Sequence, residues 1–392
     1  MKAIILAAWE GSRLKPFTNT IPKPMISIYG KTILEHNLES IYKYVTEITI
    51  VVKYKAEMIE NYLWNNFKWV PVNYHMQNDE NWTWAAIKWI ESDFDLIILN
   101  WDSIFNKNDL KAILEYKWYG ALVKQVANPE IYGIFKVDNE NNIREIVEKP
   151  ENYVWNLANL WVYKFNSSIL EIVKHIPLSK RWEYEITDAI NIYVNNYPLK
   201  AIEVKKEFID VWYPWDILNA NAHFLEKQKE SDIKWDIEKW VTIKWTVILG
   251  KWSTLKAWTY IEWNVYIWEN TSIWPNTYLR WNTVIWNNCK IWNAVEIKNC
   301  SIWNKTNISH LSYIWDSIIW NNVNIWGWFI SANLRHDNEN IKVIVKWKLI
   351  DSWLRKLGII IWDNVKTGIK SYSMPWRIIE NDSFTNPWEI IK

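Results

Sequence analysis

Glycine and cysteine are both scarce in this chain. Its 392 residues include only eight glycines, whereas an average usage near 7 % would give about 27. The chain therefore has few of the residues that backbone turns with positive φ favour. The two cysteines, Cys289 and Cys300, have no partners at metal-ligand spacing. This excludes a disulfide scaffold and a zinc ribbon, and it favours reduced thiols in a cytoplasmic protein.

The sequence also lacks a charge excess and any long apolar run. Its formal net charge is +1, which gives no electrostatic reason to expect binding to nucleic acid or to an anionic membrane. No stretch approaches the roughly 18 uninterrupted apolar residues of a membrane span. Met1 leads directly into the strand-like segment KAIILAA rather than into a signal peptide. We expect a cytoplasmic protein with no nucleic-acid or membrane partner.

Tryptophan, by contrast, is in large excess, with 34 copies. Many of them follow the apolar residues of a hexad repeat, which itself indicates a β-helix with tight corners of unusual φ and ψ. The repeat comprises Ile237, Ile243, Leu249, Leu255, Ile261, Ile267, Ile273, Leu279, Ile285, Ile291 and Ile297, then, with slips of one residue, Ile302, Ile308, Ile314, Ile319 and Ile325. The tryptophans that follow directly are Trp268, Trp274, Trp286, Trp292, Trp303, Trp315, Trp320 and Trp326.

An indole fits poorly at such corners. A non-glycine residue forced into a left-handed conformation costs about 1–2 kcal/mol, so a dozen would exhaust a typical stability of about 5–15 kcal/mol. We therefore hypothesise that most tryptophans stand where the natural protein has glycine, which would raise the glycine content to about 11 %. A codon UGA that the organism reads as glycine, translated as tryptophan, would produce this pattern. The alternative is a genuinely tryptophan-rich protein.

The chain divides into two predicted parts. Residues 1–225 alternate strand-like segments (2–8, 47–54, 96–100 and 160–165) with amphipathic helical segments (34–44, 56–63 and 106–116), which predicts an α/β domain. Residues 215–230 predict a connecting helix. The hexad repeat runs from about Ile233 to about Gly368, interrupted by a polar excursion over residues 333–340. We assign residues 1–225 to the first domain and residues 226–392 to a β-helix.

A short loop follows the first predicted strand. Residues 6–14 are LAAWEGSRL, and Ile21-Pro22-Lys23-Pro24 follows. Backbone N–H groups of such a loop can approach phosphates, and Arg13 and Lys23 can neutralise a triphosphate. The combination resembles the sugar-1-phosphate nucleotidyltransferase family, whose signature is a glycine-rich loop ending in Gly-x-Arg and followed by Pro-Lys-Pro. Trp9 stands where that signature has glycine. The resemblance implies a Rossmann-like nucleotidyltransferase domain in which Arg13 and Lys23 are catalytic.

Further strings match this family in order. Asn100-Trp101-Asp102 is similar to its Gly-Asp pair, and residues 210–216, DVWYPWD, are similar to its closing motif. The resemblance implies that Asp102 and Asp210 hold Mg²⁺, which needs few protein carboxylates because phosphates and waters complete its octahedron. Trp215 matches a position where the family commonly has tryptophan. The implied nucleotide and sugar contacts are Leu6, Ala7, Ala8, Gln77, Thr83, Gly133, Glu148 and Asn159.

The tail resembles the hexapeptide-repeat acyltransferases, and in particular the acetyltransferase half of the bifunctional glucosamine-1-phosphate acetyltransferase/N-acetylglucosamine-1-phosphate uridylyltransferases. The strings that match are Tyr278-Leu279-Arg280, residues 295–298 (VEIK), residues 309–316 (SHLSYIWD) and residues 322–325 (NVNI). The resemblance implies a left-handed parallel β-helix, His310 as the general base, and substrate contacts by Arg280, Lys298, Tyr313, Asn324 and Asn333. Asn333 is followed by Leu-Arg-His-Asp, where the bacterial enzymes have Tyr-Asp-Gly. This departure looks closer to archaeal enzymes and leaves the acceptor sugar open.

The two resemblances imply a homotrimer that makes UDP-N-acetylglucosamine. The tail would transfer an acetyl group from acetyl-CoA to glucosamine-1-phosphate, and the front domain would then transfer a uridylyl group from UTP. One alternative is a nucleotidyltransferase alone, for glucose- or mannose-1-phosphate with UTP, dTTP or GTP, in which the β-helix is an assembly or regulatory module. Another is an inactive scaffold in which the tryptophans are real.

Overall fold

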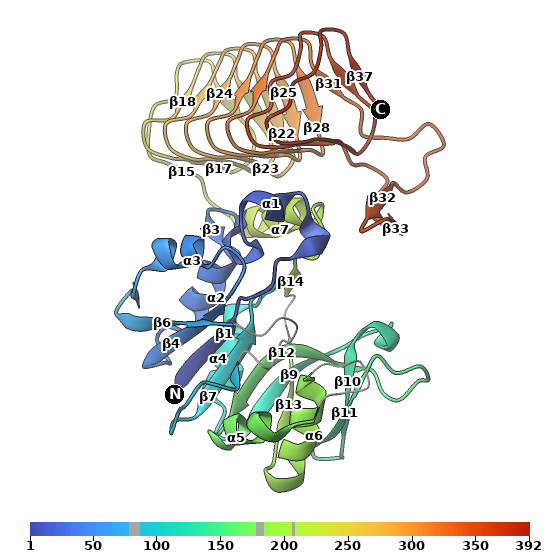
Figure 1. Cartoon of the computed structure of the whole chain (residues 1–392). Coiled ribbons are helices and arrows are strands. Elements are labelled where there is room, and N and C mark those ends of the chain that lie inside the picture. Colours follow the sequence, from blue (N-terminus) through green and yellow to red (C-terminus); the bar gives the residue numbers. More distant parts are fainter. Residues whose placement is uncertain (78–86, 178–183, 206–207) are drawn as a thin grey trace. The chain divides into compact units, whose positions relative to one another are not determined.

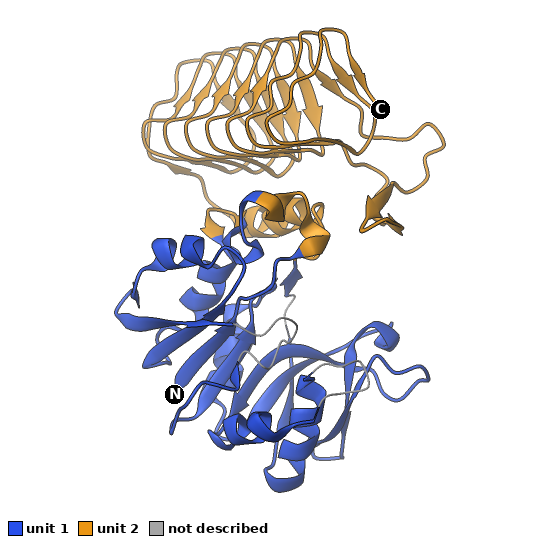
Figure 2. Cartoon of the chain, viewed as in Figure 1, with its two compact units in different colours: residues 1–11, 20–26, 32–210 blue, residues 12–19, 27–31, 211–392 orange. Residues whose placement is uncertain are grey.

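The computed structural model of the chain describes residues 1–77, 87–177, 184–205 and 208–392. These residues form two compact units, shown in different colours in Figure 2. Unit 1 comprises residues 1–11, 20–26 and 32–210, and unit 2 comprises residues 12–19, 27–31 and 211–392. Short segments near the N-terminus therefore belong with the tail.

Unit 1 is built on a mixed sheet (Figure 1). Its principal strand order is β11-β10-β12-β7-β1-β4-β6-β5, and β9 pairs with both β12 and β13. Strands β7, β1, β4 and β6 are parallel, whereas β12 runs antiparallel to β7. The strands are β1 (Lys2–Leu6), β4 (Glu47–Val52), β5 (Asn66–Phe67), β6 (Val70–Met76), β7 (Leu96–Asn100), β9 (Gly120–Gln125), β10 (Gly133–Val137), β11 (Ile143–Glu148), β12 (Leu157–Phe165) and β13 (Lys200–Glu203).

Amphipathic helices bury their apolar faces against this sheet. Leu38, Ile59 and Ile113 belong to the same core as the apolar residues of β1, β4 and β7. The helices are α2 (Ile33–Ile41), α3 (Ala56–Leu63), α4 (Lys107–Glu115), α5 (Ser168–His175) and α6 (Ile186–Asn196). The predicted α/β architecture of the front half is thus confirmed. Helix α3 has the same bounds as its apolar spacing predicted.

Unit 2 contains the predicted left-handed parallel β-helix, visible as stacked coils in Figure 1. Leu279 pairs with Ile297 eighteen residues later, and Ile297 pairs with Ile314 after only seventeen. The slip in the hexad spacing therefore shortens a coil without breaking the buried aliphatic columns. The first sheet contains β15 (Asp232–Ile233), β17 (Val247–Leu249), β20 (Val265–Ile267), β23 (Thr283–Ile285), β26 (Ser301–Ile302), β29 (Ile318–Ile319), β34 (Ile359–Ile361) and β36 (Arg377–Ile379).

Two further sheets complete the coils. The second contains β16 (Thr242–Ile243), β19 (Tyr260–Glu262), β22 (Tyr278–Arg280), β25 (Glu296–Lys298), β28 (Tyr313–Trp315), β31 (Ile330–Ser331), β35 (Tyr372–Ser373) and β37 (Ile390–Ile391). The third contains β18 (Thr254–Leu255), β21 (Ser272–Ile273), β24 (Lys290–Ile291), β27 (Asn307–Ile308) and β30 (Asn324–Ile325). The coils continue past Gly368, where the repeat was predicted to end. Isolated bridges and paired residues such as Ser373 keep the register there, although the sequence no longer follows the hexad pattern.

The excursion is longer than its polar residues predicted. It leaves the coil after β31 and returns at β34, and it contains a hairpin of β32 (Lys342–Val345) and β33 (Lys348–Asp351). Lys346 and Trp347 both have positive φ, as the two central residues of a tight hairpin turn require. Val343 and Val345 are buried, while Ile344 between them is exposed. The alternation marks two strands of a hairpin where the hexad repeat was predicted to continue.

Helix α7 (Asp216–Lys227) packs on the β-helix within unit 2. Asn264 donates a hydrogen bond to the Leu225 carbonyl at 3.1 Å. Asn221 donates to the Ser301 hydroxyl at 3.3 Å and accepts from the Tyr29 N–H at 2.8 Å. Trp215, directly before this helix, is buried and stacks on Tyr213 with 4.6 Å between ring centroids. An indole is well accommodated there, in agreement with the hypothesis that this tryptophan is authentic.

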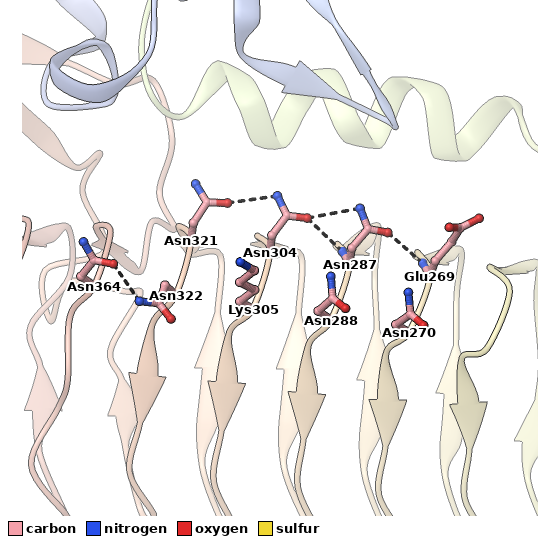
Figure 3. A pocket seen from close by; sticks show the side chains of 9 residues that line it. All are labelled: Glu269, Asn270, Asn287, Asn288, Asn304, Lys305, Asn321, Asn322 and Asn364. Atoms are coloured by element: carbon pink, nitrogen blue, oxygen red, sulfur yellow. Dashed lines mark hydrogen bonds between the residues drawn. The ribbon is translucent and has the colours of Figure 1, made fainter. Parts of the chain in front are cut away.

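One corner of the β-helix carries two rows of amide side chains, shown in Figure 3. In the inner row, Asn287 donates to Asn304 at 3.3 Å, and Asn304 donates to Asn321 at 3.1 Å. The outer row, which lies one residue further along each coil, has positive φ throughout. Its members are Asn270, Asn288, Lys305, Asn322 and Asn364. Asparagine tolerates this conformation better than most residues, which explains its recurrence at this corner.

Twelve of the described tryptophans also have positive φ, a conformation that disfavours an indole-bearing residue. They are Trp64, Trp161, Trp240, Trp252, Trp258, Trp263, Trp281, Trp328, Trp347, Trp353, Trp376 and Trp388. The eight that directly follow the hexad apolar residues do not share it, contrary to expectation. Several of these stack in columns, with 3.6 Å between the centroids of Trp303 and Trp320.

The tryptophans that stack in columns destabilise the fold in a different way, through their indole nitrogens. The indole nitrogens of Trp268, Trp286 and Trp320 are buried without a hydrogen-bond partner, and such an orphaned donor costs about 1–3 kcal/mol. Glycine would remove this penalty as well as the backbone strain elsewhere. Both observations support the hypothesis that glycine occupies these positions in the natural protein. We call the chain with glycine at every tryptophan position except Trp215 the glycine-restored chain.

Candidate active sites

The carboxyl ends of three parallel strands form one edge of the unit 1 sheet. Leu6, at the end of β1, pairs with Val51 of β4 and Asn100 of β7. Ala7 and Ala8 follow and are buried, and the Ala7 N–H donates to the Val51 carbonyl at 2.8 Å. Ligands of open α/β sheets bind at this edge. The start of the predicted phosphate loop therefore lies where a nucleotide site is expected.

Lys23 and Asp102 meet at this edge. Lys23 begins the short helix η2 (Lys23–Met25), and its Nζ lies 3.8 Å from Oδ2 of Asp102. The lysine side chain is almost completely buried, whereas the Asp102 side chain is 28 % exposed. The ammonium group also lies 4.7 Å from the centre of the Trp101 ring. That indole is buried with its nitrogen unpaired, so glycine at position 101 would open space beside both charged groups.

Asp210 lies on the strand that pairs with the one following Asp102. Strand β14 (Ile209–Asp210) runs antiparallel to β8 (Ser103–Ile104), and Asp210 is directly opposite Ser103. The Ser103 hydroxyl donates to Oδ1 of Asp210. Burial, assisted by the charge of Asp210, raises the pKa of Tyr132. The structure thus places Asp210 on the strand paired with β8, and Asp102 directly before β8.

This donor set is suitable for Mg²⁺. The ion prefers carboxylate oxygens and takes only one or two from the protein. Within the described ranges, no group of three or more histidine, cysteine, aspartate or glutamate side chains could hold a metal ion. A pair of carboxylates next to a lysine therefore fits a phosphate-bound magnesium ion better than a fully protein-ligated metal.

Three of the predicted sugar-contacting residues also come together. Gly133 of β10 pairs with Glu148 of β11. A Cβ atom at position 133 would lie 2.8 Å from Oε2 of Glu148 and 3.8 Å from Cβ of Asn159. Glycine at position 133 leaves room for the Glu148 carboxylate, which any side chain there would displace. Sequence reasoning had selected this residue from a motif, and the close approach gives the physical reason.

Asn159 is held by two hydrogen bonds within β12. Its Oδ1 accepts from the Trp161 N–H at 3.0 Å, and its Nδ2 donates to the Tyr163 hydroxyl at 2.6 Å. The pairing of β12 with β9 shifts register between Asn159 and Tyr163, and Trp161 there has a φ of 59°. Tyr163 is fully buried, which raises the pKa of its hydroxyl. The sequence analysis did not single out this tyrosine, since nothing in its local pattern distinguishes it from an ordinary core residue.

The remaining predicted residues of the front site are Gln77, Arg13 and Thr83. Gln77 is buried directly after β6, and its N–H donates to the Val52 carbonyl at 2.9 Å. Arg13 belongs to unit 2, where its guanidinium lies 5.5 Å from the centre of the Trp212 ring. Thr83 lies outside the described residues.

In the β-helix, Arg280, Lys298 and Trp315 occupy the same register position on successive coils. The Arg280 guanidinium and the Lys298 ammonium lie 5.3 Å and 4.6 Å from the centre of the Trp315 ring. Arg280 also lies 3.4 Å from Glu296. Burial lowers the pKa of Lys298; Asp316 opposes this shift, and the charges of Lys356 and Arg280 add to it. A small residue at position 315 would leave two adjacent cations facing an open space, which suits a phosphate group.

Asn333 is positioned next to these cations by Asp316. The buried Asp316 carboxylate accepts hydrogen bonds from the side chains of Asn333 and Asn299. The Leu357 N–H donates to the Asn333 carbonyl at 2.9 Å, which ties the two ends of the excursion together. The sequence analysis gave Asp316 no role of its own, although it stands in the string that contains His310 and Tyr313.

His310 lies at a different corner of the coil. It is exposed in the turn between β27 and β28, 5.4 Å from Trp292 between ring centroids. Tyr313 begins β28, whereas Arg280 and Lys298 end their strands of the same sheet. Asn324 belongs to the third sheet. Within one chain, His310 and the cation pair therefore flank opposite edges of one sheet rather than a common pocket.

Comparisons with known proteins cover nearly the whole chain. A family model described as nucleotidyl transferase matches residues 2–236. Over 96 % of its length the chain is 42 % identical to the protein named Bifunctional protein GlmU of Methanocaldococcus jannaschii, of which 91 % is covered. A Sulfurisphaera tokodaii protein named bifunctional sugar-1-phosphate nucleotidylyltransferase/acetyltransferase is 37 % identical over 96 % of the chain and 93 % of that protein.

A likeness to a solved structure supports the fold of the front half. The crystal structure of a putative glucose-1-phosphate thymidylyltransferase from Bacillus anthracis, in complex with a sucrose, aligns with a TM-score of 0.51. The match covers 57 % of this chain and 94 % of that one at 24 % identity.

Proposed function

Since the chain belongs to the family of bifunctional sugar-1-phosphate nucleotidylyltransferase/acetyltransferases, we propose that it makes UDP-N-acetylglucosamine in two steps. The tail acetylates glucosamine-1-phosphate with acetyl-CoA, and the front half transfers a uridylyl group from UTP to the product. The observation that carries the proposal is the convergence of Lys23, Asp102 and Asp210 at the carboxyl edge of the unit 1 sheet.

In the uridylyl step, a phosphate oxygen of the sugar attacks the α-phosphorus of UTP, and pyrophosphate leaves. Catalysis of such an in-line displacement consists mainly of positioning and charge neutralisation. Backbone N–H groups after β1, at Leu6, Ala7 and Ala8, would approach the phosphates, and Arg13 and Lys23 would balance their charge. Asp102 and Asp210 would hold Mg²⁺, which supplies further neutralisation of the phosphate oxygens when bound.

The sugar and the base need separate recognition. Glu148 and Asn159 lie next to Gly133, where a carboxylate and an amide can hydrogen-bond sugar hydroxyls and the N-acetyl group. Gln77 follows β6, and by resemblance its amide would bind the edge of uracil together with Thr83. Uridine rather than thymidine as the base is part of the proposal.

In the acetyl step, the amine nitrogen of the sugar attacks the thioester carbonyl and coenzyme A leaves as its thiol. A neutral imidazole can accept the amine proton near pH 7, which is the role we give to His310. Arg280 and Lys298 would hold the sugar phosphate, with Tyr313, Asn324 and Asn333 as further substrate contacts. The substrates are small molecules throughout.

A homotrimer would complete the acetyl site. His310 and the Arg280–Lys298 pair flank opposite edges of one sheet in a single chain, so packing of neighbouring copies along that sheet can bring them together. The first outward position of the strands in this sheet is mainly aromatic or apolar, which suits an interface. The residues at this position include Tyr260, Tyr278, Tyr313, Ile330, Tyr372 and Ile390. Light scattering that gave an active monomer would remove the shared-site proposal.

We also propose a cytoplasmic location. Both cysteines are free and buried, as expected in a reducing compartment. No helix in the described ranges has the length and apolar character needed to span a membrane.

Two variants of the glycine-restored chain test the proposed function. Asp102→Ala should abolish pyrophosphate release from UTP and N-acetylglucosamine-1-phosphate while acetylation of glucosamine-1-phosphate continues. His310→Ala should have the converse effect. If His310→Ala acetylates normally, the general-base role of His310 is wrong. If no acetyl transfer occurs in the unsubstituted chain, the alternative of a nucleotidyltransferase with a structural β-helix replaces the bifunctional proposal.

A further inference from the structure

The main chain of β8 is fixed by a buried amide from helix α2. Asn37 is 1 % exposed. Its Nδ2 donates to the Ser103 carbonyl at 2.8 Å, and its Oδ1 accepts from the Phe105 N–H at 3.4 Å. The amide therefore brackets Ile104 and holds the strand from one side. Because a buried amide without partners is costly, this pair of contacts strongly constrains where the strand lies.

The opposite side of β8 carries Asp210. The two-residue strand β14 pairs with β8, with Ile209 opposite Ile104 and Asp210 opposite Ser103. The Ser103 hydroxyl, in a residue only 7 % exposed, donates to Oδ1 of Asp210. One carboxylate oxygen of Asp210 thus has a fixed donor inside the fold. Asp102, which precedes Ser103 in the chain, depends on the same strand.

We propose that Asn37 and Ser103 are positioning residues for the metal-binding carboxylates. Asn37 fixes β8, and Ser103 on that strand orients the Asp210 carboxylate before any ligand binds. This inference rests on the proposed role of Asp210 as a metal ligand. Groups that hydrogen-bond to a metal ligand typically account for about 10–100-fold in metal affinity. Neither residue needs to touch substrate for this role.

Substitution of Ser103 tests the proposal by metal affinity rather than by turnover. The glycine-restored full chain is saturated with UDP-N-acetylglucosamine in the absence of pyrophosphate, so that no reaction proceeds. Mn²⁺ is then titrated, and free Mn²⁺ is followed by its electron paramagnetic resonance signal. Ser103→Ala should weaken Mn²⁺ binding by about 10-fold or more, whereas Ser103→Thr, which keeps the hydroxyl, should bind close to the unsubstituted chain.

Two further variants separate positioning from general stability. Ser40→Ala removes another largely buried hydroxyl, which donates to the His36 carbonyl one turn earlier in α2, and it should leave Mn²⁺ affinity unchanged. Asn37→Ala should weaken binding in the same direction as Ser103→Ala. The double variant should lose less than the product of the two effects, because Asn37 acts on the strand that carries Ser103.

The outcomes distinguish this inference from the proposed function. If Asp210→Ala binds Mn²⁺ as well as the unsubstituted chain, the metal role of Asp210 is wrong. If Asp210→Ala loses binding but folded Ser103→Ala retains it, the positioning role is overturned while the proposed function stands. If Ser40→Ala weakens binding as much as Ser103→Ala, the effect is one of stability, which also overturns the inference.

Discussion

The side-chain amide of Asn159 donates to the hydroxyl of Tyr163 across 2.6 Å inside the fold of unit 1. The other end of the same amide accepts from the Trp161 N–H. Both polar ends of Asn159 are therefore committed, and the orientation of its side chain next to Glu148 and Gly133 is set before a sugar arrives. Tyr163 influences a candidate binding site without being part of its surface.

Tyr163→Phe should raise the KM for N-acetylglucosamine-1-phosphate several-fold and change kcat little, because the amide of Asn159 loses its fixed donor–acceptor orientation. Steady-state kinetics of the uridylyl step in the glycine-restored chain will measure this. Tyr193→Phe is a matched control, since that buried hydroxyl accepts from the Asn166 N–H in the loop that leads into α5. Equal effects of the two variants would assign the result to core packing.

Gly133→Ala should impair sugar binding more than stability. The added Cβ would lie 2.8 Å from the flexible end of Glu148, so the carboxylate moves while the backbone stays. We expect the KM for the sugar phosphate to rise at least tenfold with a small change in the melting temperature. Gly120→Ala is the control, because its Cβ would lie 2.7 Å from Ile202, which packs against the core, and 3.0 Å from the backbone carbonyl oxygen of Lys200. That variant should lower the melting temperature and leave KM unchanged.

Asn304→Ala should destabilise the β-helix by about 0.5–1.5 kcal/mol, since it removes the partners of the Asn287 backbone N–H and the Asn321 side-chain oxygen in the amide row of Figure 3. Urea denaturation will measure the loss. Lys290→Ala, at an exposed position on the neighbouring strand β24, should change stability little. A neutral Asn304→Ala variant would show that the amide row contributes nothing measurable.

The tryptophan hypothesis predicts the mass of the natural protein. Each glycine in place of tryptophan lowers it by about 129 Da, a difference fixed by the two residue masses. Intact mass spectrometry of the protein purified from its own organism decides the matter directly. The chain with all its tryptophans, if expressed, should fold poorly and lack both activities. Normal binding of UTP and acetyl-CoA by that chain would contradict the hypothesis.

Much of the fold could be predicted because it follows periodic patterns. The hexad repeat located most coils of the β-helix, and the 3–4 spacing of apolar residues located α3. The hairpin of the excursion was missed because its apolar residues alternate over only a few positions, as with Val343, Ile344 and Val345. The last coils were missed because polar residues such as Ser373 replace the aliphatic ones.

The candidate sites were predictable only where a motif marks them. Asp102 and Asp210 were found in strings, and their pairing through β8 and β14 could not be, because it joins residues more than a hundred positions apart. Ser103, Asn37 and Tyr163 carry no local signal at all. Their roles arise from contacts between elements, which neither composition nor spacing records.

Tyr29 has a consequence for the history of the chain. Although it stands close to the N-terminus, its N–H donates to Asn221 of α7 at 2.8 Å, and its ring lies 4.8 Å from that of Tyr266 on the β-helix. A gene cut at residue 225 would remove Tyr266, and so would uncover part of a segment, residues 27–31, that begins only a few positions after Lys23. The coils therefore help to pack the chain beside the nucleotide loop, so selection on the front transfer reaction also acts on the repeats.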